Sequence, residues 1–365
     1  MNKKLISAFL ALVMLFGMIP TAVYGAGASY DKPNSFLGRY SVTENGVTRT
    51  YDTDLHVSQL TTNEIAPGIK GTDVCYYDLN NNEQIAGYMT TVDLSHGNVK
   101  IKATYKGFYN GTDSSKWNVD KWGMQTISDQ AAAYEASTGE KVVAATNGDY
   151  FNMQTGQPLG VLVMNGVNCN PDRTAAEPYF AILKDGTAVI RDKGTPIDDV
   201  EEAISSPFYL VKNGVNVVGS STELIPCNSI GVDNNGNVIT FLADGRQEPY
   251  SRGMSQFELA EFWIALGVEN VLYLDGGGSA TSLSTAADGK NLTLRNSPSD
   301  GYERTVSSGL LFISTAPEYT GEFHHASIYT AEDSYAPGAT VEFKANCIDT
   351  TGHSMSADTE WELDA

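Results

Sequence analysis

Residues 271–281, VLYLDGGGSAT, place three consecutive glycines directly after an apolar, strand-forming run and the carboxylate of Asp275. Glycine loses more backbone entropy on folding than any other residue, so three in a row are costly unless the chain must bend sharply or approach something closely. The stretch therefore predicts a buried strand that ends in a tight turn lying against a neighbour or a ligand.

A helix is predicted immediately before this strand, in SQFELAEFWIAL at residues 255–266. Ser255 and Glu258 have the spacing of a capping box, and Gly267 is placed to end the helix. Another apolar strand, VITFLADGR at 238–246, precedes the helix. The order strand, helix, strand favours a crossover with parallel strands, and a second short helix is expected after an N-cap at Ser128, ending at Gly139. The predicted fold class is α+β, a mixed-sheet catalytic domain with helices.

The chain divides by composition into four segments. Lys3 and Lys4 precede an uncharged apolar run at 5–19, which is typical of a signal peptide over residues 1–25. The run is shorter than the ~20 residues that span a membrane, so a retained anchor is the less favoured alternative. Residues 30–110 are β-rich, residues 111–316 mix α and β patterns, and residues 322–365 resemble an incomplete immunoglobulin-like module. We expect a protein that is secreted, extracellular or associated with the cell envelope, without stable membrane insertion after cleavage.

The charge of the chain excludes one large class of partner. The formal net charge is -21, which argues against nucleic acid, because phosphate backbones require a basic surface. Four scattered cysteines form no C-x-x-C pair, and the histidines offer no zinc pattern. No cofactor is expected, while metal dependence, disulfide pairing and oligomeric state are left open by the sequence.

Three apolar strands end on polar residues beside glycine: ATNGDYF at 145–151, LADGRQ at 242–247 and YLDGGGSAT at 273–281. In α/β sheets ligands bind beyond the carboxyl ends of strands, so we expect these three ends to meet at one site. Simple turns are the alternative: Asp275 as a turn cap, Asn147 with Asp149 as an Asx turn, and Asp244 with Arg246 as an ion pair. Motifs for a P-loop, a G-x-S-x-G nucleophile and an H-E-x-x-H metalloprotease are not found.

Together with GQPLGVLVMNGV and SPSDGYERTVSSGLLF, these motifs resemble the phosphodiester glycosidase domain family over residues 85–316. The resemblance implies an α+β hydrolase domain that cleaves an α-linked sugar, with N-acetylglucosamine expected, from a sugar-1-phosphodiester. The substrate would be a glycan or sugar phosphate. One departure concerns Cys227, where family members often carry an arginine that could bind phosphate or sugar.

Glycoside cleavage passes through an oxocarbenium-like state and usually needs two carboxyl groups. We expect Asp275 to act at the anomeric carbon, with Asp244 as the second carboxylate and Glu258 as its substitute. Further residues carried over by the resemblance or by their place in the motifs are expected to bind the substrate: Asn147, Gly148, Asp149, Arg246, Arg252, Gly276, Gly277, Gly278, Ser279, Thr281, Asp300 and Arg304.

Two other classes of function are consistent with the sequence. The first is an inactive carbohydrate-binding or adhesion protein on the same fold, favoured by the altered 227–229 segment. The second is a calcium-dependent or scaffolding envelope protein, favoured only by acidity and by scattered Asp and Asn loops.

Overall fold

The fold is taken from a computed structural model of the whole chain. It describes residues 36–44, 47–78, 81–106, 122–173, 176–218, 222–285, 291–317, 320–329, 340–341, 343–351, 354–358 and 360. The predicted signal peptide lies outside these residues.

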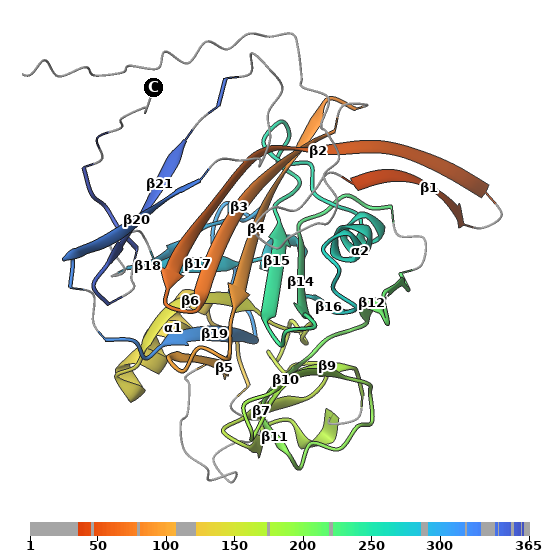
Figure 1. Cartoon of the computed structure of the whole chain (residues 1–365). Helices are drawn as coiled ribbons and strands as arrows, with labels where there is room; N and C mark the ends of the chain where they lie inside the picture. The colour runs from red at the N-terminus through yellow and green to blue at the C-terminus, as the bar shows by residue number, and fades with distance from the viewer. Residues whose placement is uncertain are drawn as a thin grey trace, which may run out of the picture.

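The largest element is a nine-stranded sheet in which every recorded pairing is antiparallel (Figure 1). Strands that follow one another through short turns pair side by side, as β14 and β15 do around the turn that follows Val232. In spatial order its strands are β1 (Phe36–Glu44), β2 (Val47–Ala66), β3 (Ile69–Asp78), β4 (Glu83–Val92), β15 (Val238–Ala243), β14 (Cys227–Val232), β16 (Asn270–Leu274), β12 (Tyr209–Lys212) and β13 (Val215–Asn216).

Three smaller sheets complete the described strands, and they too are antiparallel. The second sheet has the order β18 (Leu292–Leu294), β17 (Ser282–Thr285), β6 (Lys141–Asn147), β19 (Ser308–Ser314) and β5 (Val99–Tyr105). The third has the order β10 (Ala188–Arg191), β9 (Tyr179–Leu183), β11 (Val200–Ser205), β7 (Leu162–Met164) and β8 (Val167–Asn168). The fourth consists of β20 (Phe323–Tyr329), β21 (Lys344–Asp349) and β22 (Ser354–Met355).

Two α-helices occur among the described residues, α1 (Ile127–Thr138) and α2 (Gln256–Ala265). The predicted capping box of α2 is confirmed, because the Ser255 side chain accepts from the N–H of Glu258 and the Glu258 side chain accepts from the N–H of Ser255. The predicted N-cap of α1 is wrong. Thr126, not Ser128, accepts the N–H of Asp129, and the Ser128 hydroxyl instead donates to Glu303, a partner that lies 175 residues away.

The fold class predicted from the sequence, α+β with a mixed sheet and helices, is therefore wrong: the protein is predominantly antiparallel β. The predicted order strand, helix, strand does occur as β15, α2 and β16. Both strands pair antiparallel with β14, so they point the same way but are separated by it. The sequence pattern identified the crossover but could not show that an earlier strand lies between its two ends.

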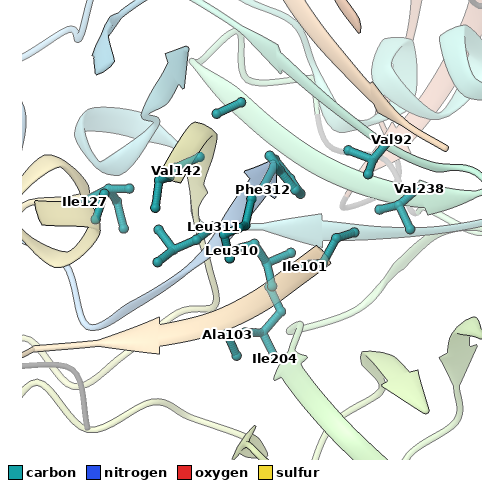
Figure 2. Close-up of a cluster of buried hydrophobic side chains, with 14 of the residues drawn as sticks. Val92, Ile101, Ala103, Ile127, Val142, Ile204, Val238, Leu310, Leu311 and Phe312 are labelled. Atoms are coloured by element: carbon teal, nitrogen blue, oxygen red, sulfur yellow. The ribbon is translucent and has the colours of Figure 1, made fainter. Parts of the chain in front are cut away.

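The main hydrophobic core lies where three sheets meet. Val92 and Val238 of the nine-stranded sheet belong to the same buried cluster as Ile101 and Phe312 of the second sheet and Ile204 of the third. Figure 2 shows these side chains together, with Ile127 of α1 at the border of the cluster. A second cluster packs α2 against the nine-stranded sheet, with Trp263 fully buried. Burial of these side chains fixes how the ends of the strands are placed relative to one another.

The predicted domain boundaries at 1–25, 30–110, 111–316 and 322–365 stay predictions. Strand β4 of the β-rich N-terminal segment pairs along its length with β15 of the following segment. Within the part of the chain that the structure covers, no helix has the length and apolar character needed to cross a membrane.

Candidate functional site

The turn at residues 275–281 connects the nine-stranded sheet to the second sheet. It follows β16 and leads into β17, with a single turn of 3₁₀ helix at Gly277–Ser279. The last residue of β6, Asn147, lies beside this turn, as do the ends of β14 and β15 that face it. The expectation that three polar strand ends lie close together therefore agrees with the observed geometry.

Asn147 holds the turn at both of its ends. Its side-chain N–H donates to the carbonyl of Asp275 at 2.7 Å, and its side-chain oxygen accepts from the N–H of Thr281 at 2.9 Å. The side-chain amide of Asn228 donates to the same oxygen at 2.9 Å. Asn147 and Asn228 are both fully buried, so they position the turn and do not reach a ligand directly.

The glycines of the turn are explained by local geometry. Gly277 has φ 57°, in the left-handed region that disfavours side chains. A Cβ atom at Gly278 would lie 2.1 Å from Nη2 of Arg304 and 2.4 Å from Oδ1 of Asp300. Glycine here lets the backbone lie directly against this ion pair. The N–H of Gly277 donates to the carbonyl of Pro226 at 2.8 Å, so that N–H group already has a partner inside the protein.

Asp275 is a half-buried carboxylate at the start of this turn. Burial raises its pKa from 3.8 to about 6, and the hydrogen bond from Ser279, the charge of Arg304 and the N–H of Gly276 oppose that rise. A carboxyl group with a pKa of about 6 is mostly ionised at neutral pH yet remains a competent base, as acid–base chemistry requires.

A second carboxylate, Asp149, lies two residues after Asn147. It is 2% exposed and accepts hydrogen bonds from the Ser205 hydroxyl and from the N–H groups of Tyr150 and Gly160. Burial raises its pKa to about 7, and the charge of Asp275 contributes to that rise. Asp149 is thus electrostatically coupled to Asp275 but is itself covered by protein.

Two arginines lie beside the glycine turn. Arg304 donates from Nε to Asp300 at 2.8 Å and lies 3.4 Å from the Ser279 hydroxyl. The guanidinium of Arg246 lies 3.4 Å from the Cβ position of Gly277; its side chain is 49% exposed, and its recorded ion pair is a 3.7 Å contact with Glu223. Both guanidinium groups can therefore approach an anion held over the turn.

Asp244, the predicted second catalytic carboxylate, is 1% exposed. Its oxygens accept from the Asn296 amide at 3.0 Å, the Ser297 N–H at 2.7 Å and the Tyr250 hydroxyl at 3.1 Å. Asn296 also donates to the carbonyl of Ala280. Asp244 is therefore joined to the glycine turn through Asn296, which also bonds Ala280.

Glu258 and Arg252 form a buried ion pair with each other. Arg252 donates to both oxygens of Glu258, at 2.8 and 3.1 Å, and both side chains are at most 2% exposed. Asp78 lies 3.6 Å from the same guanidinium. This network joins the start of α2 to β3 and leaves neither residue accessible to a substrate.

The remaining expected residues gather around Asp275. Ser279 and Thr281 are buried within the turn, and the Thr281 hydroxyl donates to the carbonyl of Ser279. Gly148 accepts the N–H of Asp275 at 2.9 Å through its carbonyl. Sequence reasoning missed Ser205 and Asn228 as partners of the site residues. In the sequence, each is simply a polar residue within an apolar strand. That pattern does not indicate which residue it will contact in the fold.

Cys227 occupies the position where the family resemblance leads one to expect arginine. Its side chain is fully buried, and the Tyr273 hydroxyl donates to its sulfur at 3.8 Å. Burial raises the pKa of the Cys227 thiol to about 12, so the thiol is neutral at physiological pH. Among the described residues, no group of three or more His, Cys, Asp or Glu side chains could hold a metal ion.

Similarity to known proteins extends over the part of the chain that contains this site. Residues 140–313 match the model of the phosphodiester glycosidase family, which covers the site from β6 to β19 and confirms the resemblance seen in the sequence. The mouse protein named N-acetylglucosamine-1-phosphodiester alpha-N-acetylglucosaminidase is 31% identical over 180 residues, 43% of this chain and 33% of the mouse chain. The human protein of that name is 29% identical over 203 residues, 47% of this chain and 36% of the human chain.

A solved structure of a hypothetical protein from Synechocystis has the same fold, with a TM-score of 0.51 and 12% identity. The alignment covers 76% of this chain and 72% of that one. The chain spans about a third of the length of the mouse and human relatives that it matches.

Proposed function

We propose that this protein is a hydrolase that releases an α-linked sugar from a sugar-1-phosphodiester. The proposal is supported by the match of residues 140–313 to the model of the phosphodiester glycosidase family. We propose N-acetylglucosamine as the sugar, in a glycan of the cell envelope or the extracellular space. The observation that carries the proposal is the position of Asp275, a half-buried carboxylate with a pKa of about 6 beside the Arg304–Asp300 pair.

The reaction breaks the bond between the anomeric carbon and the phosphate oxygen. Water adds to the anomeric carbon, the electron pair of the broken bond stays on the phosphate oxygen, and free sugar and a phosphomonoester result. Ionised Asp275 takes the proton from the attacking water and stabilises the positive charge that develops on the sugar.

Arg304 and Arg246 would hold the phosphate. A phosphate leaving group needs charge stabilisation more than a proton, and guanidinium groups donate charge-assisted hydrogen bonds to phosphate oxygens. Since the N–H of Gly277 is bonded to Pro226, the guanidinium groups carry most of this role. The Asp300 carboxylate orients Arg304 from the other side.

The other expected residues support the reaction indirectly. The contacts of Asn147, Gly148 and Asp149 favour a role in positioning Asp275. The partners of Asp244 favour a role in bracing the turn, and the ion pair between Glu258 and Arg252 favours a role in holding α2 on the sheet.

We also propose that the protein is exported. The support is the pattern of Lys3, Lys4 and the apolar run at 5–19. Detection of the mature protein in the culture medium or the cell envelope, with its N-terminus near residue 26, tests this assignment.

A second candidate is a carbohydrate-binding protein that retains the fold without the chemistry. The observation that favours it is Cys227, a buried neutral thiol where the family resemblance suggests a cation. The two candidates differ in one result: an enzyme releases sugar, and a binding protein retains it.

The test is incubation with a phosphodiester of N-acetylglucosamine-α-1-phosphate, followed by measurement of free sugar and phosphomonoester. Equal amounts of the two products, absent with Asp275→Asn, support the enzyme. Binding without release by the wild-type protein would favour the second candidate.

A further inference from the structure

A cavity of about 750 Å³ lies where α1, β5 and the third sheet meet. Part of the lining is apolar and includes Leu94 and Ile182. Ile101 also contributes to the lining, although its side chain belongs to the buried cluster of Figure 2. The volume is within the range that holds a ligand of a few hundred daltons.

This cavity is separate from the site around Asp275. Along β6, Asn147 at the site pairs with Gly309, whereas Lys141 at the other end pairs with Ser314. Ser314 in turn pairs with Val99, which lines the cavity. At ~3.3 Å per residue, Val99 is therefore roughly 20 Å along the sheet from Asn147. Lys102 and Glu202 lie nearer, because Lys102 is in register with Ala145 through Leu311 and Glu202 is three residues from Ser205, the partner of Asp149. No lining residue belongs to the site around Asp275.

The charges that line the cavity balance one another. Lys102 forms an ion pair with Glu202, which is 1% exposed, and Lys100 forms one with Glu140. The lining contains three cations and three acids: Lys100, Lys102, Lys184, Glu140, Glu201 and Glu202. An ionic ligand gains no net attraction from such a set, so a phosphate group is not the expected occupant.

The same groups present hydrogen-bond donors and acceptors side by side. Glu202 already accepts from Lys102 and from the N–H groups of Asn165 and Ala103. The more exposed Lys100–Glu140 pair retains capacity for a further partner, because an ammonium group has three donor hydrogens and a carboxylate about four acceptor positions. A ligand hydroxyl group can bond to either kind of side chain, because it donates to a carboxylate and accepts from an ammonium group. A sugar ring combines hydroxyls on its edge with apolar C–H groups on its face, which matches the polar and apolar walls.

From the balanced charges, the mixed walls and the volume, we infer that this cavity binds a neutral oligosaccharide segment. The site is distinct from the proposed catalytic site and does not depend on it. In the whole protein it would hold a second part of a glycan.

The test uses chitotriose and maltotriose as probes, titrated into the full-length protein by calorimetry. Lys184 lines the cavity and is exposed, so Lys184→Trp fills the opening without removing a buried contact. Lys193→Trp, also exposed but outside the lining, is the matched control. Melting curves check that both variants are folded.

We expect at least one triose to bind wild type and Lys193→Trp equally, and Lys184→Trp on the order of tenfold or more weakly. Failure of both trioses to bind, or equal binding to Lys184→Trp, overturns the inference. Asp275→Asn separates the two proposals, because it should abolish sugar release and leave triose binding unchanged. Triose binding without any sugar release by the wild type would reject the proposed function and keep this site.

Discussion

Asp244 and Asp275 follow the same sequence pattern, an apolar strand that ends in aspartate and glycine, yet they have different surroundings. Asp244 accepts from three donors and is 1% exposed. Asp275 is half-buried, beside an arginine pair and a glycine turn. The comparison teaches that burial and hydrogen-bond partners, and not the sequence pattern, distinguish an aspartate with room to meet a substrate from one that is enclosed by protein donors.

The largest expected effect is that of Asp275→Asn on turnover. Loss of a general base lowers kcat by on the order of 10²–10⁴. Because burial raises the pKa of Asp275, its charge is unfavourable in the folded state at pH 7. The neutral amide should therefore leave the melting temperature equal or higher. Sugar release and thermal unfolding measured on one preparation check both parts, and a variant with unchanged kcat would remove Asp275 from the chemistry.

Arg304→Ala should lower kcat/KM by on the order of a hundredfold, because the phosphate loses a charge-assisted donor in the transition state. Arg191→Ala is the control, since Arg191 pairs with Asp199 in the third sheet, away from the turn. Kinetics with the phosphodiester substrate give the values. If both variants lose activity equally, Arg304 has no special part in binding phosphate.

Asp244→Asn tests whether Asp244 stabilises the fold and takes no part in the reaction. The amide cannot accept all the hydrogen bonds that the carboxylate receives from Asn296, Ser297 and Tyr250, so we expect a loss of about 1–3 kcal/mol in the free energy of unfolding. Below the melting temperature, kcat should fall much less than for Asp275→Asn. Urea unfolding and the sugar-release assay measure the two quantities. A loss of turnover matching that of Asp275→Asn, with stability unchanged, would assign Asp244 to catalysis after all.

The smallest effect is expected for Ser255→Ala at the N-cap of α2. The hydroxyl accepts the N–H of Glu258, and loss of such a cap costs about 1 kcal/mol. Unfolding curves measure the change, and KM should stay the same because the buried Ser255 side chain caps the helix and does not face a substrate. A changed KM would show that the helix communicates with the site.

Parts of this account could be predicted from the sequence because they depend on local pattern. The capping box of α2, the end of α1 at Gly139 and the turn after Asp275 belong to this class. The fold class could not be predicted, because β14 lies between β15 and β16 and only long-range pairing reveals it.

The roles of Asp244 and Glu258 could not be predicted from the sequence either. Asn296, which binds Asp244, is 52 residues away along the chain. The partner of Glu258 is Arg252, only six residues away, yet nothing in the sequence indicates that this pair is buried.

The most direct test of the contrast between the two aspartates is the pH dependence of kcat/KM. Asp275 must be ionised to act as a base, and its pKa is raised to about 6. We therefore expect kcat/KM to level off above pH 6 and to fall tenfold per pH unit below it, in the wild type and in Asp244→Asn alike. A kcat/KM profile that stays flat down to pH 4, near the ordinary pKa of aspartate, would contradict the assignment of Asp275 as the reactive group. So would a fall below pH 6 that is present in the wild type and lost in Asp244→Asn.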